Sequence, residues 1–380
     1  RHGGLWGDPA LLAKVALRLA CNEQGSVAIG QQIEPLIAQA VRSEGYALLP
    51  VQREPVVMNI KGASASGKST MRPLQKRLAD EIGVAWGDFA LISPDIWRKQ
   101  LLDYGSLGEA YKYAGSFTGQ ELRMIDLKLD RHMAAKAERG GIPHLLIDRF
   151  RFDSFAPESD EAGSNLLTRF GRIVYLFFMI TPPEATVERS WKRGLEVGRY
   201  KAVDDLLAHN VEAYAGMPEL FFTWALARGK RVHYEFLDNS VPAGERPKTA
   251  AFGRDGELNV LEVKCLLDVA RYVHINVDAT RPEEVYRDRA AMSAEASTGF
   301  LVACARRLPA LNFAAPDSGR IYLRIEAGRP AWIEPDGLAA ALEDVETRTA
   351  ILALAPQARE APPRRAADAP RIERRHTLGR

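Results

Sequence analysis

Short apolar runs separated by segments of helical periodicity dominate the first two thirds of the chain. The runs have the length and composition of strands buried on both faces, and they span residues 56–60, 89–92, 143–147, 172–180 and 232–237. Segments with apolar residues at helical spacing lie at 71–83, 96–104, 118–138 and 184–214. This alternation predicts an α/β fold with a doubly wound, mostly parallel sheet.

The residues on either side of this core have a different pattern. Residues 1–52 contain two amphipathic segments, 11–19 and 31–41, and predict a helical N-terminal extension that either packs on the core or docks a partner. The core itself spans 53–245. Residues 246–355 mix helix and strand patterns and predict a small α+β appendage with a hairpin around Gly328. The tail, 356–380, is rich in Pro, Ala and Arg, which predicts disorder in solution.

The first apolar run leads directly into a glycine-rich loop. Residues 62–70 read GASASGKST and match the spacing G-x-x-x-x-G-K-[ST] of a phosphate-binding loop. Gly62 and Gly67 permit the turns by which backbone amides surround a phosphate. Lys68 would contact the β- and γ-phosphates, and the Ser69 hydroxyl would hold Mg²⁺ at the start of a helix. A flexible Gly/Ser linker would need neither this lysine nor the flanking strand and helix.

The sequence therefore predicts a bound nucleoside triphosphate, with ATP and Mg²⁺ as cofactors. The residues expected around the nucleotide are Gly62, Ala63, Ser64, Ala65, Ser66, Gly67, Lys68, Ser69 and Thr70.

Composition and charge exclude several other classes of protein. The 380 residues are 46% hydrophobic and 26% charged, which suits a globular fold with a large core. The net charge is +2, but the tail after residue 355 carries seven arginines against three acids, so the rest is slightly acidic and unlike a nucleic-acid binder. The three cysteines, far apart, indicate neither a zinc site nor a disulfide framework. No apolar run is long enough for a membrane span. The first residue is Arg1 rather than Met, so we expect the true N-terminus and any targeting sequence to be missing.

A carboxylate follows the second predicted strand. Ser93, Pro94 and Asp95 suit the start of a helix as N-cap, first-turn proline and first-turn acid. In an open α/β sheet, ligands bind beyond the carboxyl ends of the strands. Asp95 is therefore also a candidate general base that accepts the proton of an attacking hydroxyl. The two interpretations are compatible.

The next candidates lie around the third predicted strand. Thr118 and Glu121 have the spacing of a capping box, and a substrate-binding role for them is an equal alternative. Asp148 ends the strand, where a carboxylate would support Mg²⁺. Arg149 and Arg151 follow it, and they are either solvated or bind a phosphate of the substrate.

Three arginines indicate a lid over the nucleotide. Arg189 and Arg193 are four residues apart on one helical face, and Arg199 lies in the break that follows. Solvated arginines would look the same, but a helical lid of this kind excludes water and stabilises the charge of the transferring phosphoryl group. Asn239, after the last core strand, is expected to meet the base of the nucleotide.

These motifs together resemble the zeta-toxin-like kinases of the phosphate-loop class, and among them the type III effectors of plant pathogens that act as NAD 3′-kinases. The resemblance is carried by GASASGKST, by LISPD at the second strand, by the loop DRFRFDSF and by the lid that ends in GRY. It implies Lys68 on the phosphates, Ser69 on the metal, Asp95 as the base toward a 3′-hydroxyl, and Arg189 and Arg199 as catalytic lid arginines.

The third strand departs from the pattern of zeta toxins proper. It ends in Ile147, Asp148 and Arg149, where zeta toxins have an acidic, Gly-Thr-containing signature that helps hold an amino-sugar nucleotide. The departure favours an acceptor other than a sugar nucleotide. The acceptor that the resemblance implies is the adenosine 3′-hydroxyl of NAD, with UDP-N-acetylglucosamine as the alternative. The resemblance also implies a cognate antitoxin or chaperone partner, and a cytoplasmic location in the producing cell or, after secretion, in a host cell.

Two other classes of function are considered. A GTP-hydrolysing switch would need the guanine-specifying N-K-x-D sequence, which the chain lacks. A scaffold that binds a host protein through a vestigial loop is the remaining alternative to an enzyme.

Overall fold

The structure, a computed structural model, describes residues 4, 6–93, 95–148, 167–242, 244–356, 370–372 and 376–379. The chain divides into two units, Arg1–Pro50 and Val51–Arg380, and each is described by itself. Among the described residues, no helix is both long enough and apolar enough to cross a membrane.

The first unit is helical, as the amphipathic segments predict. It contains α1 (Pro9–Leu19), a π-helical segment (Ala20–Gly25) and α2 (Ser26–Ser43). Asp8 caps α1, since its side chain accepts a hydrogen bond from the Ala10 N–H at 3.0 Å. No residue of these three segments is buried, and their apolar side chains, such as Leu36 at 63% exposure, do not form a core of their own.

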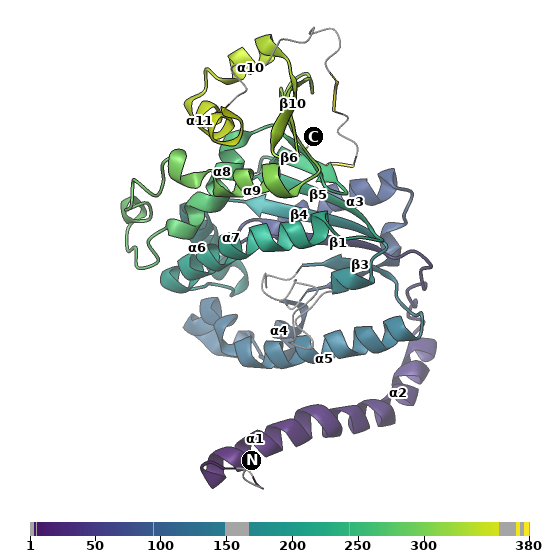
Figure 1. Ribbon diagram of the computed structural model, residues 1–380. Coiled ribbons are helices and arrows are strands. Elements are labelled where there is room, and N and C mark those ends of the chain that lie inside the picture. The colour runs from purple at the N-terminus through teal and green to yellow at the C-terminus, as the bar shows by residue number, and fades with distance from the viewer. Residues whose placement is uncertain are drawn as a thin grey trace. The chain divides into compact units, whose positions relative to one another are not determined.

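The second unit is built on one sheet, in which the described strands follow the order β10-β9-β8-β7-β6-β5-β4-β1-β3-β2. The five strands at one end, which are the predicted ones, are all parallel to one another. They are β1 (Val56–Lys61), β2 (Phe89–Ile92), β3 (His144–Ile147), β4 (Ile173–Ile180) and β5 (Arg231–Asp238). Figure 1 shows this arrangement from β3 up to β10.

Helices cover both faces of the parallel strands, and β4 shows why its sequence is apolar throughout. Val174 and Phe178 pack with residues of α7, whereas Tyr175 and Phe177 pack with residues of α3 such as Leu78. A strand buried on both faces needs an apolar residue at every position. The fold is therefore the doubly wound α/β fold that the sequence predicts.

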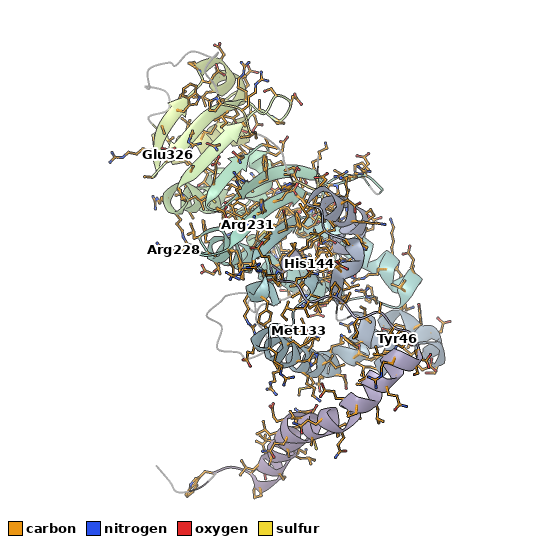
Figure 2. The ribbon with its side chains drawn as sticks, turned by 90° about the vertical axis from the view of Figure 1, so that its right-hand side faces the viewer. Tyr46, Met133, His144, Arg228, Arg231 and Glu326 are labelled. Atoms are coloured by element: carbon orange, nitrogen blue, oxygen red, sulfur yellow. The ribbon has the colours of Figure 1, made fainter. Side chains whose placement is uncertain are left out.

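Helices and short 3-10 turns connect these strands. His144, labelled in Figure 2, fixes the start of β1, because its Nδ1 accepts a hydrogen bond from the Val56 N–H at 2.8 Å. The helices are α3 (Arg72–Glu81), α4 (Asp95–Leu101), α5 (Gly119–Glu138), α6 (Pro183–Val197) and α7 (Val203–Ala225). The main 3-10 segments near the site are Lys68–Met71, Gly105–Tyr113 and Ser116–Thr118.

The C-terminal region, expected as an appendage, continues the same sheet. Its strands are β6 (Lys248–Arg254), β7 (Glu257–Val260), β8 (Ala310–Ala314), β9 (Ile321–Glu326) and β10 (Arg329–Ile333). β6 pairs antiparallel with β5, and the helices of this region are α8 (Val263–Arg271), α9 (Gly299–Arg307), α10 (Pro335–Ala341) and α11 (Val345–Leu354). Residues of α7, α8, α9 and α11 share one hydrophobic cluster, so the region packs as part of the core. The predicted hairpin joins β9 and β10 through Ala327 and Gly328, both at positive φ.

The described residues of the tail, which the sequence predicts to be disordered, contact the rest of the second unit. Arg371 forms an antiparallel bridge with Arg320, and the His376 ring makes an edge contact with Tyr175. Leu378 is completely buried in the cluster that contains α3, and its N–H donates to Glu235 at 2.7 Å. Composition alone does not show that a single leucine near the end of a polar tail enters the core.

Candidate active site

The phosphate loop has the backbone shape that its glycines allow. Ala65 and Gly67 have positive φ values of 60° and 94°, so neighbouring amides turn to one side as in an anion-binding nest. The Lys68 ammonium donates to the carbonyl oxygens of Gly62 at 2.8 Å and Ala63 at 2.7 Å. A 3-10 turn over Lys68–Met71 precedes α3, so the helix expected at the end of the loop begins with a tighter turn.

A group of donors behind the loop holds the carbonyl of Ser66. This oxygen accepts hydrogen bonds from Thr181 Oγ1 at 3.0 Å, Asn239 Nδ2 at 2.8 Å and Arg189 Nη1 at 3.4 Å. Arg189 Nη2 also donates to the Asn239 carbonyl at 3.3 Å. These bonds hold the Ser66 carbonyl on the side of the loop that faces β4 and β5.

Asn239 therefore lies in a different place from the one that the sequence analysis expected. Its side chain supports the phosphate loop, is only 6% exposed and is absent from the lining of the cavity below. Gly67 is needed for this contact, because a Cβ there would lie 2.8 Å from Asn239 Nδ2.

The loop opens into a cavity of about 810 Å³. This volume lies within the range of small-molecule sites. Its described lining consists of Ser64, Ala65, Ser66, Gly67, Lys68, Ser69, Thr70, Arg72, Ser93, Arg98, Gly115, Ser116, Gly119, Asp148, Arg189, Arg193, Arg199, Tyr200, Lys201, Asp205 and His209. Among these residues, seven lysines and arginines face two aspartates, so the cavity suits a ligand with several negative charges.

The three predicted lid arginines all line this cavity. Arg189 and Arg193 lie on α6, and Arg199 lies in the turn between α6 and α7. Arg193 Nε donates to the Arg199 carbonyl at 3.0 Å, which links the helix to the turn. Gly198 ends α6 at a φ of 68°, and a Cβ there would lie 2.6 Å from the Tyr111 carbonyl. Glycine at this position is thus required by a close contact with the 3-10 segment Gly105–Tyr113.

The acidic candidates follow two neighbouring strands, Asp95 after β2 and Asp148 after β3. Asp148 lines the cavity, its N–H donates to the Ile92 carbonyl at 2.9 Å, and its carboxylate lies 3.7 Å from Arg72 Nη2. Ser93, directly after β2, also lines the cavity. Asp95 begins α4 two residues later, and its side chain lies outside the described part of the structure.

A magnesium ion fits these residues. Ser69 and Asp148 line the same cavity as the phosphate loop, and a hydroxyl plus a carboxylate is a typical protein contribution when phosphates and water supply the other ligands of Mg²⁺. No group of three or more acidic, histidine or cysteine ligands is present among the described residues.

The expected substrate residues are only partly placed. Thr118 is at the N-cap position of α5, but it makes no capping hydrogen bond; its hydroxyl donates to the Gly115 carbonyl at 3.3 Å and accepts from Arg98 at 2.9 Å. The capping-box prediction is therefore wrong. Neither Thr118 nor Glu121 lines the cavity. Arg149 and Arg151 lie outside the described residues.

The sequence analysis missed several residues of the cavity wall. Arg72, Arg98, Lys201 and His209 all line it, and Arg98 also donates to the Gly115 carbonyl. A solitary basic residue on an amphipathic helix resembles a solvated one in sequence. The one usable signal was the spacing of Asp205 and His209, which places both on one face of α7, directly after the predicted lid.

Comparisons with known proteins add the following. No known protein family matches the chain, and no curated protein sequence matches it. Among solved structures, a similar one comes from the molecular and structural characterization of the PezAT chromosomal toxin–antitoxin system of the human pathogen Streptococcus pneumoniae. It is 18% identical over 54% of this chain and 78% of that chain, with a TM-score of 0.34. A likeness of this size carries no argument about function, which must come from the site.

Proposed function

We propose that this chain is an ATP-dependent phosphotransferase that phosphorylates a 3′-hydroxyl of a nucleotide metabolite. The observation that carries the proposal is one cavity in which a phosphate loop, a strand-end carboxylate and three lid arginines meet. NAD is the expected acceptor and UDP-N-acetylglucosamine the alternative, as the resemblance to zeta-toxin-like kinases implies. A cognate antitoxin or chaperone that blocks the site is part of the same proposal.

In this mechanism the protein supplies position and charge. The loop amides and Lys68 bind the β- and γ-phosphates of ATP, while Ser69 and Asp148 would hold Mg²⁺, which supplies charge neutralisation when bound. Arg189 and Arg199 stabilise the negative charge that spreads over the transferring phosphoryl group.

Asp95 is proposed as the base that accepts the proton of the attacking hydroxyl. Its support is its place in the chain, two residues after Ser93, which lines the cavity at the carboxyl end of β2. The hydroxyl oxygen forms its bond to the γ-phosphorus, the bond to the bridging oxygen of ADP breaks, and the proton passes to the carboxylate.

The proposal is tested by incubating the protein with ATP, Mg²⁺, NAD, UDP-N-acetylglucosamine and a metabolite extract, followed by mass spectrometry. We expect one compound to gain a single phosphate, and its fragmentation to place that phosphate on a 3′-oxygen. Lys68→Ala should abolish the product. If no compound is phosphorylated, or if Lys68→Ala keeps the full effect of the wild-type protein on cells, the proposed enzyme activity is contradicted. A scaffold that binds a host protein is then favoured.

The role of Asp95 has its own test. Asp95→Asn should keep ATP binding close to normal in a thermal-shift assay and lower turnover by at least about a hundredfold, the effect of losing a general base. The matched control is Asp204→Asn, an exposed acid in the first turn of α7 that does not line the cavity. Equal turnover in the two variants would refute the assignment.

A further inference from the structure

A lysine at the end of the lid turn is held inside the cavity by two side chains of α7. Lys201 Nζ lies 2.6 Å from His209 Nε2 and 3.5 Å from Asp205 Oδ2. Asp205 and His209 are four residues apart and so share one face of the helix. All three line the cavity into which the phosphate loop opens.

The backbone of this lysine is fixed from both sides. The Lys201 N–H donates to Ser190 Oγ at 3.2 Å, and Ser190 is fully buried in α6. The preceding N–H, of Tyr200, donates to the Lys112 carbonyl at 2.8 Å. The Lys201 side chain is only 17% exposed. Its ammonium group is therefore ordered rather than freely solvated.

The charge states of the pair follow from burial. Burial, followed by the positive charge of Lys201, lowers the pKa of His209 to about 4, so the ring is neutral near pH 7. Nε2 then accepts a hydrogen bond from the ammonium, and the ring proton is on Nδ1. Burial also lowers the pKa of Lys201 to about 8, against the opposing effect of Asp205, so the lysine is still mostly charged at neutral pH.

Other charged groups also face this pair. Two of these groups are acidic and two are basic. They shift the pKa values of Lys201 and His209, but they do not replace the contacts of Lys201 with His209 and Asp205. The groups are Asp205 and Glu212 on α7, Arg193 on α6 and Lys68 in the phosphate loop.

We propose that Lys201 binds an anionic phosphate oxygen in the cavity and that His209 is the residue that positions it. An ammonium group has three N–H donors, and among the described residues two of them are directed at His209 and Asp205. The third is available to a ligand. This inference rests on the proposed function, and it adds a cationic contact to those proposed for Lys68, Arg189 and Arg199. The oxygen belongs either to ATP or to a phosphate of the acceptor.

The test compares Lys201→Met and Lys201→Arg with the wild type. The control is Lys192→Met, since Lys192 is 60% exposed on α6 and pairs with Glu188. Lys201→Met should lower kcat/KM at least about tenfold, the effect of losing a hydrogen bond to a charged group. A rise in the KM for ATP would assign the oxygen to the donor, a rise in the KM for the acceptor would assign it there, and a fall in kcat alone would assign it to the transferring group.

The pH profile separates this role from a structural one. Wild-type kcat/KM should fall as the pH rises through about 8, because the charged lysine is lost. Lys201→Arg should keep activity within about tenfold and lose this alkaline fall, because arginine stays charged. His209→Gln, which keeps an acceptor, should retain more activity than His209→Leu.

Two results would overturn the inference. One is activity of Lys201→Met within about twofold of Lys192→Met, and the other is an alkaline fall that Lys201→Arg leaves unchanged. If the wild type transfers no phosphate to any acceptor, the proposed function fails by itself, and calorimetric titration with ATP still decides the inference. The same titration is made with NAD and with UDP-N-acetylglucosamine, and equal affinity of Lys201→Met and wild type for all three ligands would overturn the inference as well.

Discussion

Replacing Leu378 by alanine tests whether the end of the chain is part of the core beneath the phosphate loop. Leu378 is completely buried and packs in the cluster that includes Leu74 and Leu78 of α3. Its N–H donates to Glu235 Oε2 at 2.7 Å, and its carbonyl accepts from Arg77 Nη2 at 3.0 Å. The segment 376–379 thus joins β5 to the helix that begins at the nucleotide site.

The magnitude follows from the burial. Leucine-to-alanine changes in a core cost about 2–5 kcal/mol. Here the cost cannot exceed the free energy of docking the segment, because the segment can detach, so we expect the lower end, about 2–3 kcal/mol. The control is Leu195→Ala, at a leucine that is 56% exposed, which should change stability by less than about 0.5 kcal/mol.

The assay is equilibrium unfolding in urea, combined with hydrogen exchange of the amides of α3. Leu378→Ala should lower the unfolding free energy and speed exchange in α3 more than in α7. Since α3 follows directly from the loop, ATP affinity should weaken as well. If Leu378→Ala and Leu195→Ala unfold at the same urea concentration and α3 exchanges as in the wild type, the docked segment does not exist as described.

Two further predictions concern residues that contact the same elements. Burial raises the pKa of Glu235 from 4.5 to about 7, so its contribution to stability is complete below about pH 4.5 and is lost as the pH rises through 7. Relative to Glu235→Gln, the wild type should therefore lose about 3 kcal/mol over that interval in urea titrations, and parallel profiles of the two proteins would contradict the buried carboxylate. Asn239→Ala should raise the Kd for ATP about tenfold through loss of the hydrogen bond to Ser66, with the preference for ATP over GTP unchanged. A changed base preference would instead place Asn239 against the base.

The parallel strands and the phosphate loop could be predicted because their signals are local. A strand buried on both faces needs a continuous apolar run, as in 173–180, and a phosphate loop needs glycines at fixed spacing. The arginines of the predicted lid could be selected for a similar reason, since Arg189 and Arg193 are four residues apart next to a glycine break. The structure places both in the cavity, and their role as a lid stays a prediction.

The remaining site residues could not be found from the sequence because their roles depend on distant partners. Asn239 follows a strand that ends at the ligand edge, and only the packing shows that its amide meets the Ser66 carbonyl, 173 residues earlier. Thr118 has capping-box spacing, yet its hydroxyl accepts a hydrogen bond from Arg98 and donates one to the Gly115 carbonyl. Lys201 differs from a solvated lysine only because its ammonium group contacts His209 on α7.

The two walls of the cavity differ in how they are built. The phosphate loop is fixed to β4 and β5 through the Ser66 carbonyl. The opposite wall consists of two segments that are joined by two backbone hydrogen bonds. The Gly115 N–H donates to the Gly198 carbonyl at 3.1 Å, and the Tyr200 N–H donates to the Lys112 carbonyl at 2.8 Å. These bonds connect the 105–118 segment to the turn after α6, which carries the basic side chains of Arg199 and Lys201. The two walls are not independent, because Arg189 of α6 donates to the Ser66 carbonyl at 3.4 Å and so joins α6 to the loop.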